Sequence, residues 1–121
     1  MRAALALLLL VLAPAAWAGE ADVVAVAIER HPGTEDVFDV RATILSNDTG
    51  EDYYADAFEV LAPDGRLLGR IEFAHPHADE QPFTRALENL KVPLGIDRVT
   101  VRAHHKPRGY GGQTVTVGLP R

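Results

Sequence analysis

Histidine is the residue type with the most potential chemistry in this chain, and four of its five copies lie in two short stretches. One stretch reads His-Pro-His and the other reads His-His. Imidazole groups bind Zn(II), Cu(II) and Ni(II), so the pattern suggests a divalent-metal site whose ligands are His75, His77, His104 and His105. Histidines near strand ends also form structural hydrogen bonds or contact partners. Metal binding and metal-free recognition therefore both stay open at this point.

Polar loops that could recognise a partner contain these histidines. They span residues 46–54, 75–83 and 104–113. Loops of this kind carry recognition in many folds because a rigid scaffold tolerates their variation. The side chains that we expect to contact a protein or a small ligand are His75, His77, Glu80, Arg85, His104, His105 and Tyr110.

Residues for covalent catalysis are scarce. The chain has no cysteine, its single methionine is Met1, and its single serine is Ser46. No Gly-x-Ser-x-Gly turn surrounds Ser46, and the lack of sulfur after Met1 leaves no thiolate nucleophile and no thioether ligand for Cu(I). We predict that the protein is not an enzyme. If a cofactor is bound, the ligand types favour Zn or Cu(II).

The first eighteen residues have the features of a secretory signal peptide. Arg2 supplies a positive charge, residues 5–12 form an apolar run, and Ala16-Trp17-Ala18 has the small-x-small pattern of a cleavage site. We predict cleavage after Ala18 and a periplasmic or secreted product. The apolar run is shorter than the roughly 20 residues of a spanning helix, although an uncleaved membrane anchor is the alternative. No cysteine follows the run, so we do not expect lipoprotein processing.

Residues 19–121 are of a length that suits one domain with a single core. The formal net charge of the whole chain is −5, and no basic stripe offsets it. An acidic surface of this kind argues against binding nucleic acid through bulk charge. The oligomeric state is open.

Apolar residues from residue 21 onward alternate mostly with a period of two, which predicts strands separated by turns. Seven such runs suggest an all-β sandwich of the immunoglobulin-like or fibronectin type III-like kind. For residues 83–90, Pro82 could instead begin a helix, but a strand is preferred because the sandwich needs it. The seven predicted strands are 23–28, 38–44, 54–61, 67–74, 83–90, 98–103 and 113–119.

Strand parity predicts where the three loops lie. Consecutive strands run in alternating directions, so the loops after the second, fourth and sixth strands share one end of the sandwich. Continuing the alternation of the strands places His75 and His105 on the inner side and His77 and His104 outside them. Arg85 paired with Glu80 or Asp56 would brace the cluster.

The block His-Pro-His-Ala-Asp-Glu-Gln-Pro-Phe-Thr-Arg at residues 75–85 is the most specific part of a resemblance that extends from roughly residue 38 to residue 120. The chain resembles small exported proteobacterial proteins of unassigned function. This resemblance implies an Ig-like exported domain and brings no activity with it. The expected function is a non-catalytic binding module, with a metal-binding periplasmic protein as the alternative.

Overall fold

The computed structural model describes residues 8–12 and 20–121, and the rest of the predicted signal peptide lies outside the described residues. The described residues form strands and no helix. We predicted seven strands, but eight are found; the predicted seven correspond to β2–β8. The strands are β1 (Leu8–Leu12), β2 (Ala21–Arg30), β3 (Val37–Ser46), β4 (Tyr54–Leu61), β5 (Leu67–Glu72), β6 (Phe83–Lys91), β7 (Arg98–Lys106) and β8 (Val115–Gly118).

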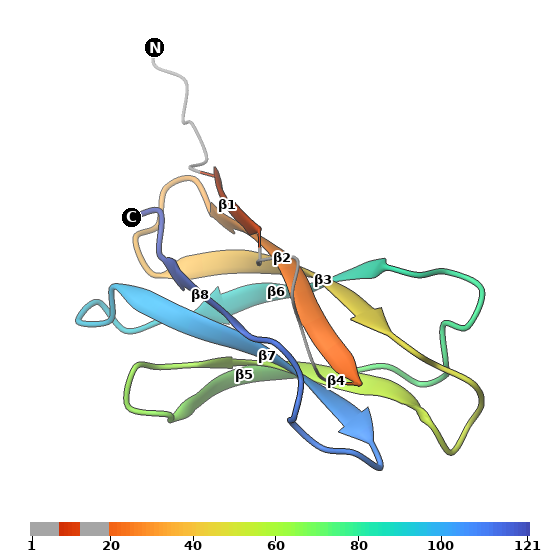
Figure 1. Cartoon of the computed structure of the whole chain (residues 1–121). Coiled ribbons are helices and arrows are strands. Elements are labelled where there is room, and N and C mark those ends of the chain that lie inside the picture. Colours follow the sequence, from red (N-terminus) through yellow and green to blue (C-terminus); the bar gives the residue numbers. More distant parts are fainter. Residues whose placement is uncertain (1–7, 13–19) are drawn as a thin grey trace.

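The strands form two antiparallel four-stranded sheets that pack face to face (Figure 1). The first sheet has the order β1-β2-β3-β6 and the second the order β5-β4-β7-β8. This arrangement is a β-sandwich, as the alternating sequence predicted. Among the described residues, none forms a helix long and apolar enough to cross a membrane.

The core lies between the two sheets and is built from the inward side chains of both. Phe38 and Phe83 come from the first sheet, Phe58 comes from the second, and all three are fully buried. Burying one such ring contributes about 1.5–3 kcal/mol, so the three aromatics are a substantial part of the stability of the sandwich.

β6 resolves the choice between helix and strand for residues 83–90 in favour of the strand. It pairs with β3 in antiparallel register, with Phe83 opposite Ile44 and Thr84 opposite Thr43. The hydroxyl groups of Thr43 and Thr84 lie 2.8 Å apart on the outer face of the sheet. If residues 83–90 had formed a helix, the first sheet would lack β6, its edge strand.

β1 is the strand that the sequence did not predict. It occupies part of the apolar run that we assigned to the signal peptide, and it pairs with β2 at the edge of the first sheet. Its alternation is regular, because Leu9 and Val11 pack against the core while Leu8 and Leu10 are exposed. The same short apolar run therefore has the sequence pattern of a signal peptide and also forms the edge strand of a sheet. Cleavage after Ala18 stays a prediction.

Candidate functional site

The connections β3–β4, β5–β6 and β7–β8 gather at the same end of the sandwich (Figure 1). They contain the three polar loops 46–54, 75–83 and 104–113. The hydrogen bonds and ring contacts of a few buried polar side chains tie these loops to one another.

Asp48 is the centre of this arrangement and is buried, with 7% of its surface exposed. Its Oδ1 accepts hydrogen bonds from Ser46 Oγ at 2.6 Å and from the backbone N–H of Ala55 at 2.9 Å. Its Oδ2 accepts the backbone N–H of His77 at 2.8 Å. A buried carboxylate is costly unless such donors surround it. The carboxylate of Asp48 therefore links the first loop to the second.

Gln81 adds a second link between the same two loops. Its Oε1 accepts the backbone N–H of Ser46 at 2.8 Å, while its Nε2 donates to Ser46 Oγ at 3.2 Å and to the carbonyl of His77 at 3.0 Å. Loops 46–54 and 75–83 are thus joined by side chains that lie 35 residues apart in the sequence.

The third loop joins through His105, which is 1% exposed. The His105 ring meets the ring of Tyr53 from the first loop edge-on, with 4.4 Å between the centroids. Its backbone N–H donates to Gly109 at 2.8 Å, which closes the loop on itself. Further along, Gly112 lies so close to β2 that a Cβ there would come 1.8 Å from the carbonyl oxygen of Ala21. The third loop is therefore packed tightly against the first sheet.

The predicted order of the second pair of histidines is correct, because His105 is buried and His104 is half-buried. The predicted order of the first pair is wrong, because His75 is exposed and His77 is buried. The physical reason is that β5 ends at Glu72, so the alternation of the strand does not continue to His75. His77 instead stacks on Phe83, with 4.0 Å between the centroids and 13° between the planes.

Burial lowers the pKa of His77, and the positive charge of Arg85 adds to this effect although Asp48 opposes it. Burial likewise lowers the pKa of His105, against the opposing pull of nearby carboxylates, of which Glu20 acts most strongly. Both imidazoles are therefore favoured in their neutral form. His77 Nδ1 and His105 Nε2 are buried without a hydrogen-bond partner, which is consistent with rings held mainly by packing.

His104 belongs to a different surface from His105, since neighbouring residues of a strand point to opposite faces. Its Nδ1 lies against Asp56 Oδ1, and its ring packs edge-on against Tyr110 with 4.7 Å between the centroids. The four candidate metal ligands are therefore divided among separate surroundings. Over residues 8–12 and 20–121, no three His, Cys, Asp or Glu side chains are grouped as a metal site would require. Metal binding stays the alternative function.

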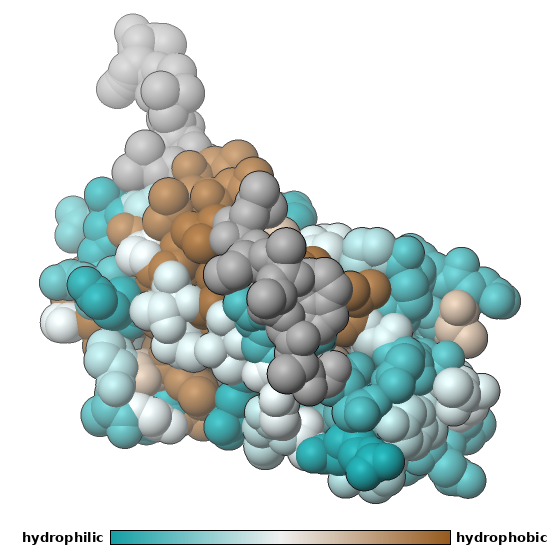
Figure 2. Space-filling view, viewed as in Figure 1, coloured by the Kyte–Doolittle hydropathy of each residue, from teal (hydrophilic) through white to brown (hydrophobic). Residues whose placement is uncertain are grey.

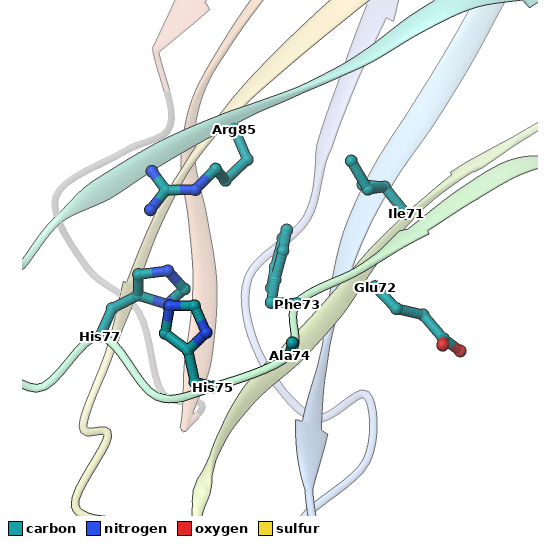
Figure 3. Close-up of a pocket in the computed structure, with 7 residues that line it drawn as sticks. All are labelled: Ile71, Glu72, Phe73, Ala74, His75, His77 and Arg85. Carbon is teal, nitrogen blue, oxygen red and sulfur yellow. The ribbon is translucent and has the colours of Figure 1, made fainter.

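A pocket with a volume of about 220 Å³ opens where the second loop meets the edges of β5 and β6. Figure 3 shows the guanidinium of Arg85 turned toward the imidazoles of His75 and His77, with the ring of Phe73 beside them. A second, more open hollow of about 460 Å³ is also lined by His75, His77 and Arg85. The lining of the first pocket is Ile71, Glu72, Phe73, Ala74, His75, His77 and Arg85.

Arg85 is positioned by a short network at the rim of these hollows. Its Nη2 donates to Glu80 Oε1 at 3.3 Å, and its Nη1 donates to the carbonyl of Thr84 at 2.7 Å. Glu80 is one of the two partners that the sequence predicted; the other, Asp56, lies against His104. The Arg85 and Glu80 side chains are 38% and 58% exposed, so this ion pair is weak and a ligand can compete for the guanidinium.

Sequence reasoning missed a polar cluster around Glu59 on the outer face of the second sheet. Glu59 is only 4% exposed; Arg70 and Arg102 both donate to it, the latter from Nε at 2.9 Å, and Tyr110 donates at 3.0 Å. Burial opposes ionisation of Glu59, but hydrogen bonds from Arg102 and Arg70 outweigh it and lower the pKa of this carboxyl. The guanidinium of Arg102 also lies 3.7 Å from the centroid of the Tyr110 ring.

The partners of Glu59 are set by register, since Arg70 and Arg102 lie directly opposite it on β5 and β7. The alternation around Glu59 is visible in the sequence and places it outward, between inward neighbours on β4. The register of the three strands is not visible in this way. Tyr110, which we predicted as a binding residue, is 41% exposed and also helps to hold Glu59.

No known protein family matches the sequence. No solved structure matches the chain either. The chain is similar to a protein of Halomicrobium mukohataei named "Putative lipoprotein", with 43% identity over 98 residues. The match covers 81% of this chain and 47% of that protein, so the chain spans about half the length of this relative.

Proposed function

We propose that the protein is an exported, non-catalytic binding module with an Ig-like fold, which recognises a partner through its loop end. The fold assignment is supported by the order of strands β2–β8. Lettered A, B, C, C′, E, F and G, they give the sheets A-B-E and C′-C-F-G, in which C, F and G neighbour one another as they do in immunoglobulin-like domains.

Export is supported by the signal-peptide pattern of residues 1–18 and by the name of the relative. Lipoproteins are exported proteins, so this name agrees with the pattern in the sequence. The proposed location is the periplasm or the exterior of the cell.

The observation that carries the proposal is the clamp that Asp48 forms between the first two loops. Because the loops are fixed by buried hydrogen bonds, the ligand does not have to order them. Ordering an interface costs free energy on association, so a fixed surface binds more tightly than a mobile one of equal area.

The pocket indicates the chemistry of the ligand. Phe73 and Ile71 supply apolar walls, while Arg85 and His75 supply hydrogen-bond donors at the rim. A guanidinium binds carboxylates through two parallel hydrogen bonds. We therefore assign to the pocket a peptide segment in which an apolar side chain stands next to a carboxylate.

Selection of a displayed random-peptide library on the exported protein tests this function. The expected result is enrichment of peptides with an acidic residue beside an apolar one, which bind with a Kd in the micromolar range, about −8 kcal/mol. Arg85→Gln should weaken this binding at least tenfold. Arg98→Gln is the matched control. Arg98 is an exposed arginine at the end of β7 that lies away from the loops, so this substitution should leave the affinity unchanged.

A library without enrichment would contradict the proposed ligand class. Peptides that bind Arg85→Gln as tightly as they bind the unaltered protein would contradict the pocket as their site.

A further inference from the structure

The side of β2 that faces away from β3 is a second candidate for an interaction surface, and it lies away from the loops. In the described chain this edge is covered by β1, whose residues pair in continuous register with Ala25–Glu29 of β2, from Leu8 opposite Glu29 to Leu12 opposite Ala25. Figure 2 shows hydrophobic residues gathered over the region where Figure 1 places β1.

β1 also contacts β8, so it spans the gap between the edges of the two sheets. Leu9 and Val11 reach the core from this position. The way in which β1 binds shows two properties of this edge of β2. The edge accepts a strand in antiparallel orientation, and it accepts apolar side chains at alternate positions.

The predicted cleavage after Ala18 would remove β1 and uncover this edge. The backbone groups of β2 that now pair with β1 would then have no strand beside them, and the apolar surface beneath Leu9 and Val11 would be exposed. A bare, apolar strand edge pairs readily with another strand, and proteins usually cover or block such edges. Within Ala25–Glu29, the segment that pairs with β1, Glu29 is the only charged residue.

We propose that, in the processed protein, this edge is covered by β2 of a second copy of the chain, so that the first sheets of two copies join into one. The support comes from the sequence of β2 itself. Val26 and Ile28 are buried and point inward, while Ala25 and Ala27 point outward and are small. An antiparallel second β2 thus presents the same inward alternation that Leu9 and Val11 present in β1.

A two-fold axis at Ala27 makes the pairing self-complementary. Ala27 would face its own copy, Val26 would face Ile28 of the second copy, and Ala25 would face Glu29. Directly opposed residues of antiparallel strands share a face, so apolar residues meet inward and no like charges oppose each other across the axis. Closed two-fold pairing of one surface with itself is the commonest form of oligomer.

The proposed dimer leaves the loop pocket free. β6, which borders the pocket, is the opposite edge of the first sheet from β2. The two pockets of a dimer would therefore lie at the two outer edges of the joined sheet. A ligand that is presented in several copies could engage both.

The test begins with the full-length gene expressed in a bacterial host that exports the product. The purified protein is weighed by mass spectrometry and by sedimentation equilibrium. The expected result is a chain cleaved after Ala18 that sediments as a dimer at micromolar concentration. A processed chain that stays monomeric at these concentrations overturns the proposal. A chain that is not cleaved overturns it as well, because β1 would then still cover the edge.

Cysteine cross-linking then locates the interface, since the chain has no cysteine of its own. Opposed residues in antiparallel strands have Cα atoms about 4.5–5.5 Å apart, within the range that a disulfide spans. Ala27→Cys should give a disulfide-linked dimer under mild oxidation. Thr116→Cys is the control, because Thr116 is an exposed outward residue on β8 at the edge of the other sheet. Equal cross-linking of the two variants, or none of Ala27→Cys, overturns the proposal.

Charge substitution tests the same axis without covalent chemistry. Ala27→Glu alone and Ala27→Lys alone should each be monomeric, because like charges would face each other directly. An equimolar mixture of the two should recover the dimer. Dimers that persist in both single variants would place the contact elsewhere and overturn the proposal, provided that circular dichroism shows each variant folded.

Discussion

Asp48 accepts the backbone N–H of His77 at 2.8 Å, across 29 residues of sequence. The same carboxylate accepts Ser46 Oγ and the backbone N–H of Ala55 near the start of β4, so a single buried side chain fixes the relative position of two loops. This bond helps to fix the loop surface that we propose for binding.

Loss of the Asp48 carboxylate should therefore destabilise the whole sandwich. Asp48→Ala removes the acceptor of three buried donors, and we expect a loss of about 2–4 kcal/mol in the free energy of unfolding. Urea denaturation followed by circular dichroism measures it. Asp79→Ala is the matched control, since Asp79 is exposed in the second loop and should change stability by less than about 0.5 kcal/mol. Equal effects of the two substitutions would show that Asp48 has no special role.

Acidification should weaken the fold through the buried histidines. Burial lowers the pKa of both His77 and His105 below the ordinary value of 6.5, so the unfolded chain binds protons more readily than the folded chain. This contribution to stability is complete above about pH 6.5 and is lost as the pH falls through the folded-state pKa values. The free energy of unfolding, measured by urea titration at a series of pH values, should decrease over this window.

His77→Phe isolates one of the two groups. Phenylalanine can keep the stacking on Phe83, and the backbone N–H that binds Asp48 is unchanged. The variant should lose less stability on acidification than the unaltered protein does. A pH dependence of equal steepness in both proteins would assign the effect to other groups.

We expect the polar cluster around Glu59, on the outer face of the second sheet, to stabilise the protein. Glu59→Gln removes the charge that Arg70 and Arg102 share, and we expect a loss of about 1–3 kcal/mol. Glu72→Gln is the control, because Glu72 also pairs with Arg70 but its side chain is 73% exposed. Thermal unfolding should separate the two variants by several degrees; coincident curves would mean that burial of Glu59 adds nothing.

Zinc binding should be weak, because the four histidines do not share one site. Calorimetric titration of the exported protein with zinc is expected to show no site tighter than about 10 μM, a free energy near −7 kcal/mol. Tighter binding that is lost in His75→Ala and His105→Ala would support the metal-binding alternative. His31→Ala is the control for adventitious coordination at the surface.

The sequence predicted the sandwich and the end at which the loops meet, because alternation is a local property. Val99, Val101 and Ala103 alternate inward, and the strand continues through His105, so the buried position of His105 could be predicted. The same reasoning failed for His75 because β5 ends three residues earlier. Where a strand ends depends on its partners, which no local pattern contains.

Asp48 and Glu59 show a second limit. Both residues matter because they form hydrogen bonds to residues far away in the sequence. Asp48 binds the backbone of His77, and Glu59 binds Arg102. Such contacts require the register between strands, which is fixed by the packed core and the turns together. The additional strand β1 shows a third limit, since one apolar run can match both a leader peptide and a sheet edge.

Recognition through the loop end can be followed residue by residue in the amide chemical shifts of the ¹⁵N-labelled protein as a selected acidic–apolar peptide is added. The largest shifts should fall at His75, His77 and Arg85, with none at the opposite turn around Gly65. Shifts centred on that turn, or spread evenly over the sandwich, would contradict it.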